Sequence, residues 1–124
     1  MLRALRRQDD KWGLSAPRLS ALSVVVFGGP IKLGDLARAE QVRPPTMTKL
    51  VRALEKAKLV TRKADRVDGR ISWIAATARG RELLMKGRAE RVKALAERLR
   101  SYSAAQVADL DAAATLIEDV AIEL

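Results

Sequence analysis

The chain of 124 residues contains no cysteine and no histidine. Without cysteine it can have no disulfide framework, thiolate zinc site or cysteine redox switch, and a cytoplasmic location is the default expectation. Without histidine it lacks the commonest general base and the commonest metal ligand. Since there is also no glycine-rich phosphate loop and no nucleophile beside a base, we expect no metal, no cofactor and no enzymatic activity.

Aromatic residues and long apolar runs are also scarce. Only 3% of residues are aromatic, which weakens the case for single-stranded nucleic acid bound by base stacking, and for a membrane-surface helix. The longest uncharged stretch, residues 19–31, is short for a membrane span and is interrupted by Gly28-Gly29-Pro30. The basic start has no long apolar segment behind it, so we expect neither a secretory signal nor a membrane partner.

Positive charge is abundant and unevenly placed. The net charge is +9, and residues 1–30, 31–100 and 101–124 contribute +3, +11 and −5. A concentrated positive charge attracts a polyanion through the release of counterions, and nucleic acid is the first candidate. We therefore expect a nucleoid-associated protein whose basic middle binds double-stranded DNA, with the acidic tail pointing away from it.

The pattern of apolar residues predicts one domain that is mainly α with a small β-hairpin wing. Helices are predicted over 2–12, 16–27, 33–40, 44–57 and 78–100, and from Ser103 to the C-terminus. Strands are predicted at 59–63 and 71–74, joined by a basic loop of about five residues. Ser15, Thr77 and Ser103 are placed to cap the helices that follow them.

The predicted helix at 44–57 has one apolar and one basic side. Its apolar stripe consists of Met47, Leu50, Val51 and Leu54. A short helix joined to such a helix by a tight connection is typical of the helix-turn-helix, which inserts its second helix into a major groove. The predicted DNA contacts here are Arg43, Pro45, Thr46, Thr48, Lys49, Arg52 and Lys56. The alternative is an ordinary amphipathic surface helix.

The predicted hairpin adds a second basic surface. Its DNA candidates are Arg62, Arg66, Asp68 and Arg70. A hairpin tip of this charge can cross the backbone, and an arginine at its base can enter a narrow minor groove. Asp68 is placed to hold the Arg70 guanidinium by a charge-assisted bond. The alternative is a polar turn in which Gly69 only supplies backbone freedom.

The last two predicted helices have seams typical of helices that pack along their length. In the last helix the apolar residues are spaced 3, 4, 3, 4 and 3 apart. The predicted dimerisation residues are Val107, Leu110, Ala114, Ile117, Ala121 and Leu124, together with Leu2 and Leu5 of the front helix. Two-fold pairing with a second chain would place the two helices at 44–57, one from each chain, one helical turn apart on DNA. The alternative is a helical hairpin buried within one chain.

Taken in order, these segments resemble the MarR family of winged helix-turn-helix transcription regulators. The residues that carry the resemblance are Leu36-Ala37, 44–55, 59–62, Asp68-Gly69-Arg70 and 77–83. The resemblance implies a homodimer that binds a palindromic operator, usually as a repressor, and that a small aromatic effector often releases. It implies a helix at 44–57 in the major groove and a wing motif at Asp68 and Arg70. The implied layout is a winged helix-turn-helix at 14–76, flanked by dimerisation segments at 1–13 and 77–124.

The chain departs from the family pattern at several positions. Arg43 stands where a capping serine is common, Ala57 where glycine is usual, and Ala76 where a larger apolar residue is usual. The front helix is short, and the absence of cysteine excludes the family's peroxide-sensing mode. The few aromatic residues are interpreted as packing residues, so no effector contact is named. Two other functions stay open: a winged-helix module that binds a protein, and an architectural DNA binder without sequence preference.

Overall fold

A computed structural model describes residues 13–123. The helix predicted at 2–12, with Leu2 and Leu5, and the terminal Leu124 lie outside the described residues. The chain divides into two compact units, Met1–Ala89 and Glu90–Leu124. The boundary falls within α5, and each unit is described by itself.

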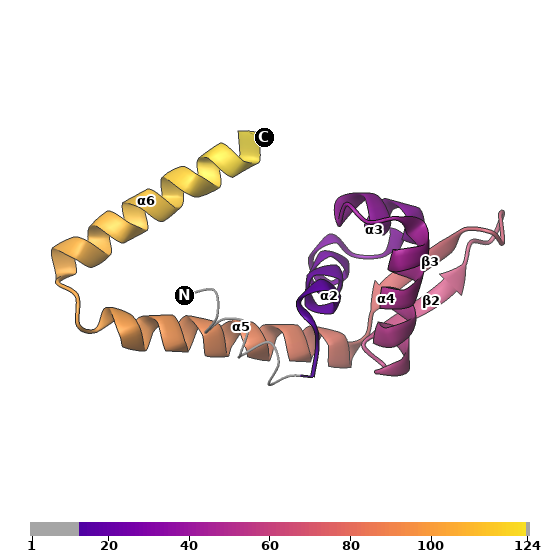
Figure 1. Ribbon diagram of the computed structural model, residues 1–124, viewed down its shortest axis with the longest axis horizontal. Coiled ribbons are helices and arrows are strands. Elements are labelled where there is room, and N and C mark those ends of the chain that lie inside the picture. The colour runs from indigo at the N-terminus through magenta and orange to yellow at the C-terminus, as the bar shows by residue number, and fades with distance from the viewer. Residues whose placement is uncertain (1–12, 124) are drawn as a thin grey trace. The chain divides into compact units, whose positions relative to one another are not determined.

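The first unit contains α2 (Ala16–Gly28), β1 (Ile31–Lys32), α3 (Leu33–Ala39), α4 (Pro44–Lys56), β2 (Val60–Ala64) and β3 (Ser72–Ala76). It also contains the first turns of α5 (Ala78–Leu99), and α6 (Ala104–Glu123) follows in the second unit (Figure 1). The predicted helices and strands in the described part are confirmed within two residues at each end. The fold class, mainly helical with a small antiparallel sheet, is therefore confirmed.

The core of the first unit lies where α2, α3 and α4 meet the sheet. Met47, Val51 and Leu54 of α4 are fully buried, as are Leu22 of α2 and Leu36 of α3. Each buried side chain of this size stabilises the fold by about 1.5–3 kcal/mol relative to exposure. Because the apolar stripe of α4 is committed to this core, its basic side must face outward.

The sheet has three antiparallel strands in the order β1-β3-β2, one strand more than predicted. Strand β1 pairs Ile31 with Ile74 and Lys32 with Trp73. Two residues are too few to produce a period-2 signal in the sequence, and their partner strand lies some forty residues away. The hairpin loop between β2 and β3 spans 65–71 and is longer than predicted.

Two of the three predicted caps are confirmed. The Thr77 hydroxyl accepts a 3.0 Å hydrogen bond from the Gly80 N–H, and the Ser103 hydroxyl accepts one of 3.1 Å from the Gln106 N–H. The third prediction was wrong, because Ser15 stands at the N-cap of α2 without a side-chain capping bond. Pro17, in the first turn of that helix, has no N–H to donate, which removes one of the two usual partners of such a cap.

In the second unit, no residue of α6 in the described range is buried. Ile117 is 70% exposed and Leu110 49%, and in the last turns of α5 Val92 is 59% exposed. The a/d seam predicted from the sequence therefore lies open along this helix.

In the part of the chain that the structure describes, no helix is both long and apolar enough to cross a membrane.

Candidate nucleic-acid interface

A tight turn positions the start of α4. Gln41 takes a left-handed conformation with φ 56°, and the Val42 N–H donates a 3.0 Å bond to the carbonyl of Ala37. Arg43 stands at the N-cap in extended conformation without a side-chain capping bond, and Pro44-Pro45 form the first turn, where prolines are tolerated. Arg43, which replaces the capping serine common in the family, thus has its side chain exposed at the start of the helix.

The outward side of α4 carries the predicted DNA contacts. Those exposed along this helix and its N-cap are Arg43, Pro45, Thr46, Lys49, Arg52 and Lys56. Thr48 is half-buried, and its hydroxyl donates a 3.0 Å hydrogen bond to the carbonyl of Pro44. Six of the seven candidates are therefore exposed, while the Thr48 hydroxyl, whose hydrogen is bonded to Pro44, can accept a further bond from a partner.

The end of α4 joins the helix to the wing. Ala57 keeps a right-handed conformation and Lys58 takes the left-handed one with φ 61°, so the replacement of the usual glycine at Ala57 causes no strain there. The Leu59 N–H donates a 3.0 Å bond to the carbonyl of Leu54. Beyond this turn, Arg62 of β2 lies 3.6 Å from the Glu55 carboxylate of α4. Arg62 therefore bridges helix and hairpin.

Asp68 and Arg70 form the predicted pair at the base of the wing. The Asp68 carboxylate accepts bonds from the Arg70 backbone N–H, Nε and Nη2 at 3.0, 3.1 and 3.2 Å. These bonds, the guanidinium first, lower the pKa of Asp68, so the carboxylate stays charged at neutral pH. The Arg70 side chain is 91% exposed, which leaves its remaining N–H groups available to a ligand.

A second carboxylate, Asp65, shapes the wing and was not predicted as a site residue. Asp65 accepts a 2.8 Å bond from the indole nitrogen of Trp73, and bonds of 3.1 and 3.0 Å from the backbone N–H groups of Val67 and Asp68. The Trp73 bond and then the backbone bonds lower the pKa of Asp65. The bonds to the next residues are an Asx turn that the sequence could have suggested. The bond to Trp73 depends on the hairpin register and could not have been found that way.

A third set of contacts holds the start of α5 against the turn after α4. The Thr77 hydroxyl donates a 2.8 Å bond to the carbonyl of Lys58, and the Thr77 N–H donates one of 3.0 Å to the carbonyl of Leu59. Gly80 is buried directly over Leu59, with no room for a side chain. The turn after α4 is thus fixed by two hydrogen bonds from Thr77 to backbone carbonyls.

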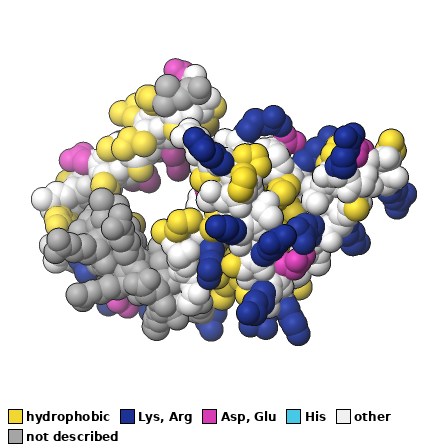
Figure 2. All heavy atoms as spheres, turned by 45° about the vertical axis from the view of Figure 1, so that its right-hand side comes forward, with side chains coloured by type: hydrophobic (Ala, Val, Ile, Leu, Met, Phe, Trp, Pro, Cys, Tyr) yellow, Lys and Arg dark blue, Asp and Glu magenta, His cyan; other side chains and the backbone are white. Residues whose placement is uncertain are grey.

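The charged surfaces of α4 and the wing belong to one compact unit. Helix α4 and strand β2 are joined through the Glu55–Arg62 pair, and Arg66 is exposed in the loop beyond β2. Figure 2 shows Lys and Arg side chains spread over the displayed face of this unit, with few Asp or Glu side chains among them. Across residues 13–123, no group of three or more acidic side chains is arranged to hold a metal ion.

A helix-turn-helix, a three-stranded sheet with a charged wing, and an outward basic side on the second helix define the winged helix-turn-helix class of DNA-binding transcription regulators. The family model described as "MarR family" matches residues 14–72. An uncharacterized HTH-type transcriptional regulator of Mycobacterium bovis, Mb0904, is 34% identical over 93% of this chain and 80% of its own length. The chain belongs to the MarR family.

Solved structures are similar over almost the whole chain. The YusO protein of Bacillus subtilis matches with a TM-score of 0.82 at 21% identity, over 97% of this chain and 83% of its own. A mutant of MepR from Staphylococcus aureus, bound to an oligodeoxyribonucleotide, matches with a TM-score of 0.77 at 20% identity, over 95% and 87%. NadR in complex with 4-hydroxyphenylacetate matches with a TM-score of 0.74 at 20% identity, over 98% and 82%. At these identities the likeness establishes the fold.

Proposed function

We propose that the protein binds a palindromic operator in double-stranded DNA as a homodimer and represses transcription. Helix α4 lies in the major groove, and the wing at 62–70 lies on the adjoining minor groove and backbone. The observation that carries the proposal is the pairing of two exposed cationic surfaces on one unit, with Arg70 oriented by Asp68. The proposal assigns no catalytic activity to the chain.

In this proposal the side chains divide into two groups by what they read. Lys49 and Arg52 project from the outward side of α4 and can reach guanine edges as well as phosphates. Arg66 and Arg70 belong to the wing, where contacts to phosphates and to the narrow groove dominate. Thr46 and Thr48 flank the basic side, and Arg43 and Lys56 add charge at its ends. Arg62 lies beside it on β2, paired with Glu55.

The proposed layout has a DNA-binding region at 14–76 and dimerisation segments at 1–13 and 77–124. The exposed seam of α6, with Val107, Leu110, Ala114, Ile117 and Ala121 on one face, supports pairing with a second chain. A palindromic operator follows from such a two-fold axis. A small aromatic effector would release the DNA, and the complex of the structurally similar NadR with 4-hydroxyphenylacetate supports this part of the proposal.

The experiment begins by selecting bound duplexes from a library of fragments of the host genome. Binding of the wild type and of Lys49→Ala, Arg52→Ala and Arg70→Ala is then measured by mobility shift on the selected duplex and on a shuffled one. We expect each variant to bind the selected duplex at least about fivefold more weakly, since one good base contact contributes about 1–3 kcal/mol. Circular dichroism serves as the folding control.

Other outcomes would assign another function. Equal affinity of the wild type for selected and shuffled duplexes would indicate an architectural DNA binder. If the wild type binds no duplex at all, the remaining candidate is a winged-helix module that binds a protein. Unchanged binding by all three variants would contradict the assignment of α4 and the wing to DNA.

A further inference from the structure

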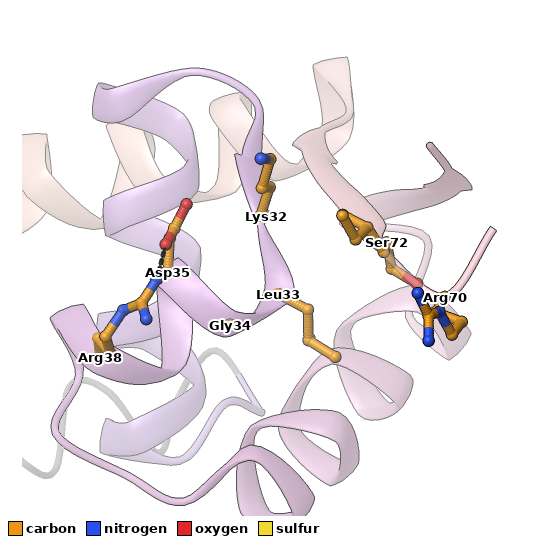
Figure 3. A pocket seen from close by; sticks show the side chains of 8 residues that line it. Lys32, Leu33, Gly34, Asp35, Arg38, Arg70 and Ser72 are labelled. Atoms are coloured by element: carbon orange, nitrogen blue, oxygen red, sulfur yellow. Dashed lines mark hydrogen bonds and ion pairs between the residues drawn. The ribbon is translucent and has the colours of Figure 1, made fainter. Parts of the chain in front are cut away.

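The first unit has a hollow between β1, the start of α3 and the base of the wing, with a volume of about 290 Å³. Three cationic side chains line it, Lys32 from β1, Arg38 from α3 and Arg70 from the wing (Figure 3). Only Arg70 belongs to the surfaces already described. The sequence predicts the segment around α3 as the first helix of the helix-turn-helix and assigns no DNA contact to it.

The unpredicted strand β1 is what brings these side chains together. Lys32 pairs with Trp73 in the sheet, so it lies beside β3, the second strand of the wing hairpin. Its ammonium group is 5.4 Å from the centre of the Trp73 ring, which holds it near the wing by a cation–π contact. Residues forty positions apart in the sequence thus line one hollow.

The acidic groups at the hollow are already engaged. Asp35, the one carboxylate of its lining, is bonded to Arg38, and Asp68, at the base of the wing, is bonded to Arg70. An arginine has five N–H donors and a lysine three, so each cation keeps donors after these bonds. The side chains of Arg38 and Arg70 are 80% and 91% exposed, so these donors can reach a ligand on a large surface.

We infer that this hollow binds a phosphate group of the DNA backbone, next to the segment that the wing contacts. An anion is favoured because the three cations keep unbonded N–H donors beside the hollow after Asp35 and Asp68 have bonded to the two arginines, and a phosphate because its oxygens can accept from several donors at once. The inference rests on the proposed function and extends it, since it adds Lys32 and Arg38 to the DNA-binding surface. These two residues supply affinity and register, because a phosphate contact carries no base information.

The test is a salt titration of DNA affinity by fluorescence anisotropy, for the wild type and for Lys32→Gln combined with Arg38→Gln. The proposed homodimer loses one phosphate contact in each subunit, so the negative slope of log K against log salt should become less steep by about 1.8. At about 0.1 M salt this corresponds to about 60-fold weaker binding. The loss should be the same on the selected duplex and on a shuffled duplex, whereas Lys49→Ala should reduce the preference for the selected one.

Two further proteins serve as controls. Arg81→Gln combined with Arg88→Gln removes the same charge from exposed positions of α5 and should leave the slope unchanged. Lys32→Arg combined with Arg38→Lys keeps the charge and should retain wild-type binding, which separates loss of contact from loss of fold. Circular dichroism is recorded for all variants.

Three outcomes would overturn the inference. If the wild type binds the selected duplex and the Gln double variant has the same slope and affinity, the hollow holds no backbone phosphate, while the proposed function stands. If low-millimolar inorganic phosphate binds the wild type and not the double variant, and leaves the affinity for the duplex unchanged at constant ionic strength, the hollow is a site for a free anion and not for DNA. If the wild type binds no duplex, the inference and the proposed function fall together.

Discussion

The carbonyl oxygen of Leu59 lies so close to Gly80 that a β-carbon at position 80 would overlap it. Leu59 directly precedes the first strand of the wing, and Gly80 lies in the first turn of α5. Between them, Thr77 bonds to the carbonyls of Lys58 and Leu59. The end of α4, the wing and α5 therefore meet in a junction where the atoms nearest to a β-carbon at position 80 belong to the backbone of Leu59.

Gly80→Ala should destabilise the protein by about 1–3 kcal/mol, because a backbone carbonyl must shift to admit the new methyl group. Urea denaturation measures the loss. Gly34→Ala is the matched control, since it also adds a methyl group to a helical glycine but meets no atom within 4 Å. Alanine favours helix by about 1 kcal/mol over glycine, so this control should be neutral or stabilising. Equal effects of the two substitutions would contradict the tight junction.

The Leu59–Gly80 contact illustrates what the sequence could and could not predict. Local signals were sufficient for the apolar stripe of α4, the caps at Thr77 and Ser103, and the Asp68–Arg70 pair, because each depends on residues within one turn or loop. Strand β1 and the fit of Gly80 depend on contacts between distant segments, and the Asp65–Trp73 bond depends on the register of the hairpin. No periodicity or cap signal in a single sequence encodes such contacts.

The bond between Asp65 and Trp73 in the wing should depend on pH, because Asp65 loses its charge in acid. Its pKa in the folded protein is lowered from the ordinary value of 3.8, first by the Trp73 bond. A carboxyl group whose pKa is lower in the folded protein than in the unfolded chain stabilises the fold at pH values above its unfolded pKa. This stability is lost as the pH falls through the pKa of the folded protein. The Trp73 indole resonance, identified in NMR spectra by comparison with Trp73→Phe, should therefore shift with a midpoint below 3.8.

The matched variant is Asp65→Asn, which keeps the shape of the side chain and removes its titration. In this variant the acid shift of the Trp73 resonance should disappear, and the free energy of unfolding should depend less on pH in the same acidic range. A wild-type midpoint at or above the ordinary carboxyl value would show that the Asp65–Trp73 bond does not favour the charged form.

The Asp68–Arg70 pair predicts a non-additive result in DNA binding. Asp68→Ala should weaken binding because the guanidinium loses its orientation, although the removed negative charge partly offsets that loss. In the Arg70→Ala background the same change should cost little, because there is no guanidinium left to orient. Anisotropy measurements on all four proteins of the cycle give the coupling. Additive effects would mean that Asp68 does not act through Arg70.

Two neighbouring residues of α6 test the dimer seam. Ile117 is 70% exposed and lies on the seam, whereas Leu116 is 65% exposed and lies outside it. A charge buried in an interface without a partner is strongly unfavourable, so Ile117→Glu should shift the protein toward monomer at micromolar concentration, and Leu116→Glu should not. Sedimentation measures the two masses. A dimer that tolerates Ile117→Glu would exclude this seam as the interface.

A hydroxyl-radical footprint of the wild type and of Arg70→Ala on the selected duplex tests the central claim most directly. The claim is that α4 and the wing contact DNA together. It predicts two protected half-sites about one helical turn apart, each with a flank over the minor groove that is lost in Arg70→Ala while the protection beside the major groove remains. A footprint with no flank, or one that Arg70→Ala leaves intact, would contradict the claim.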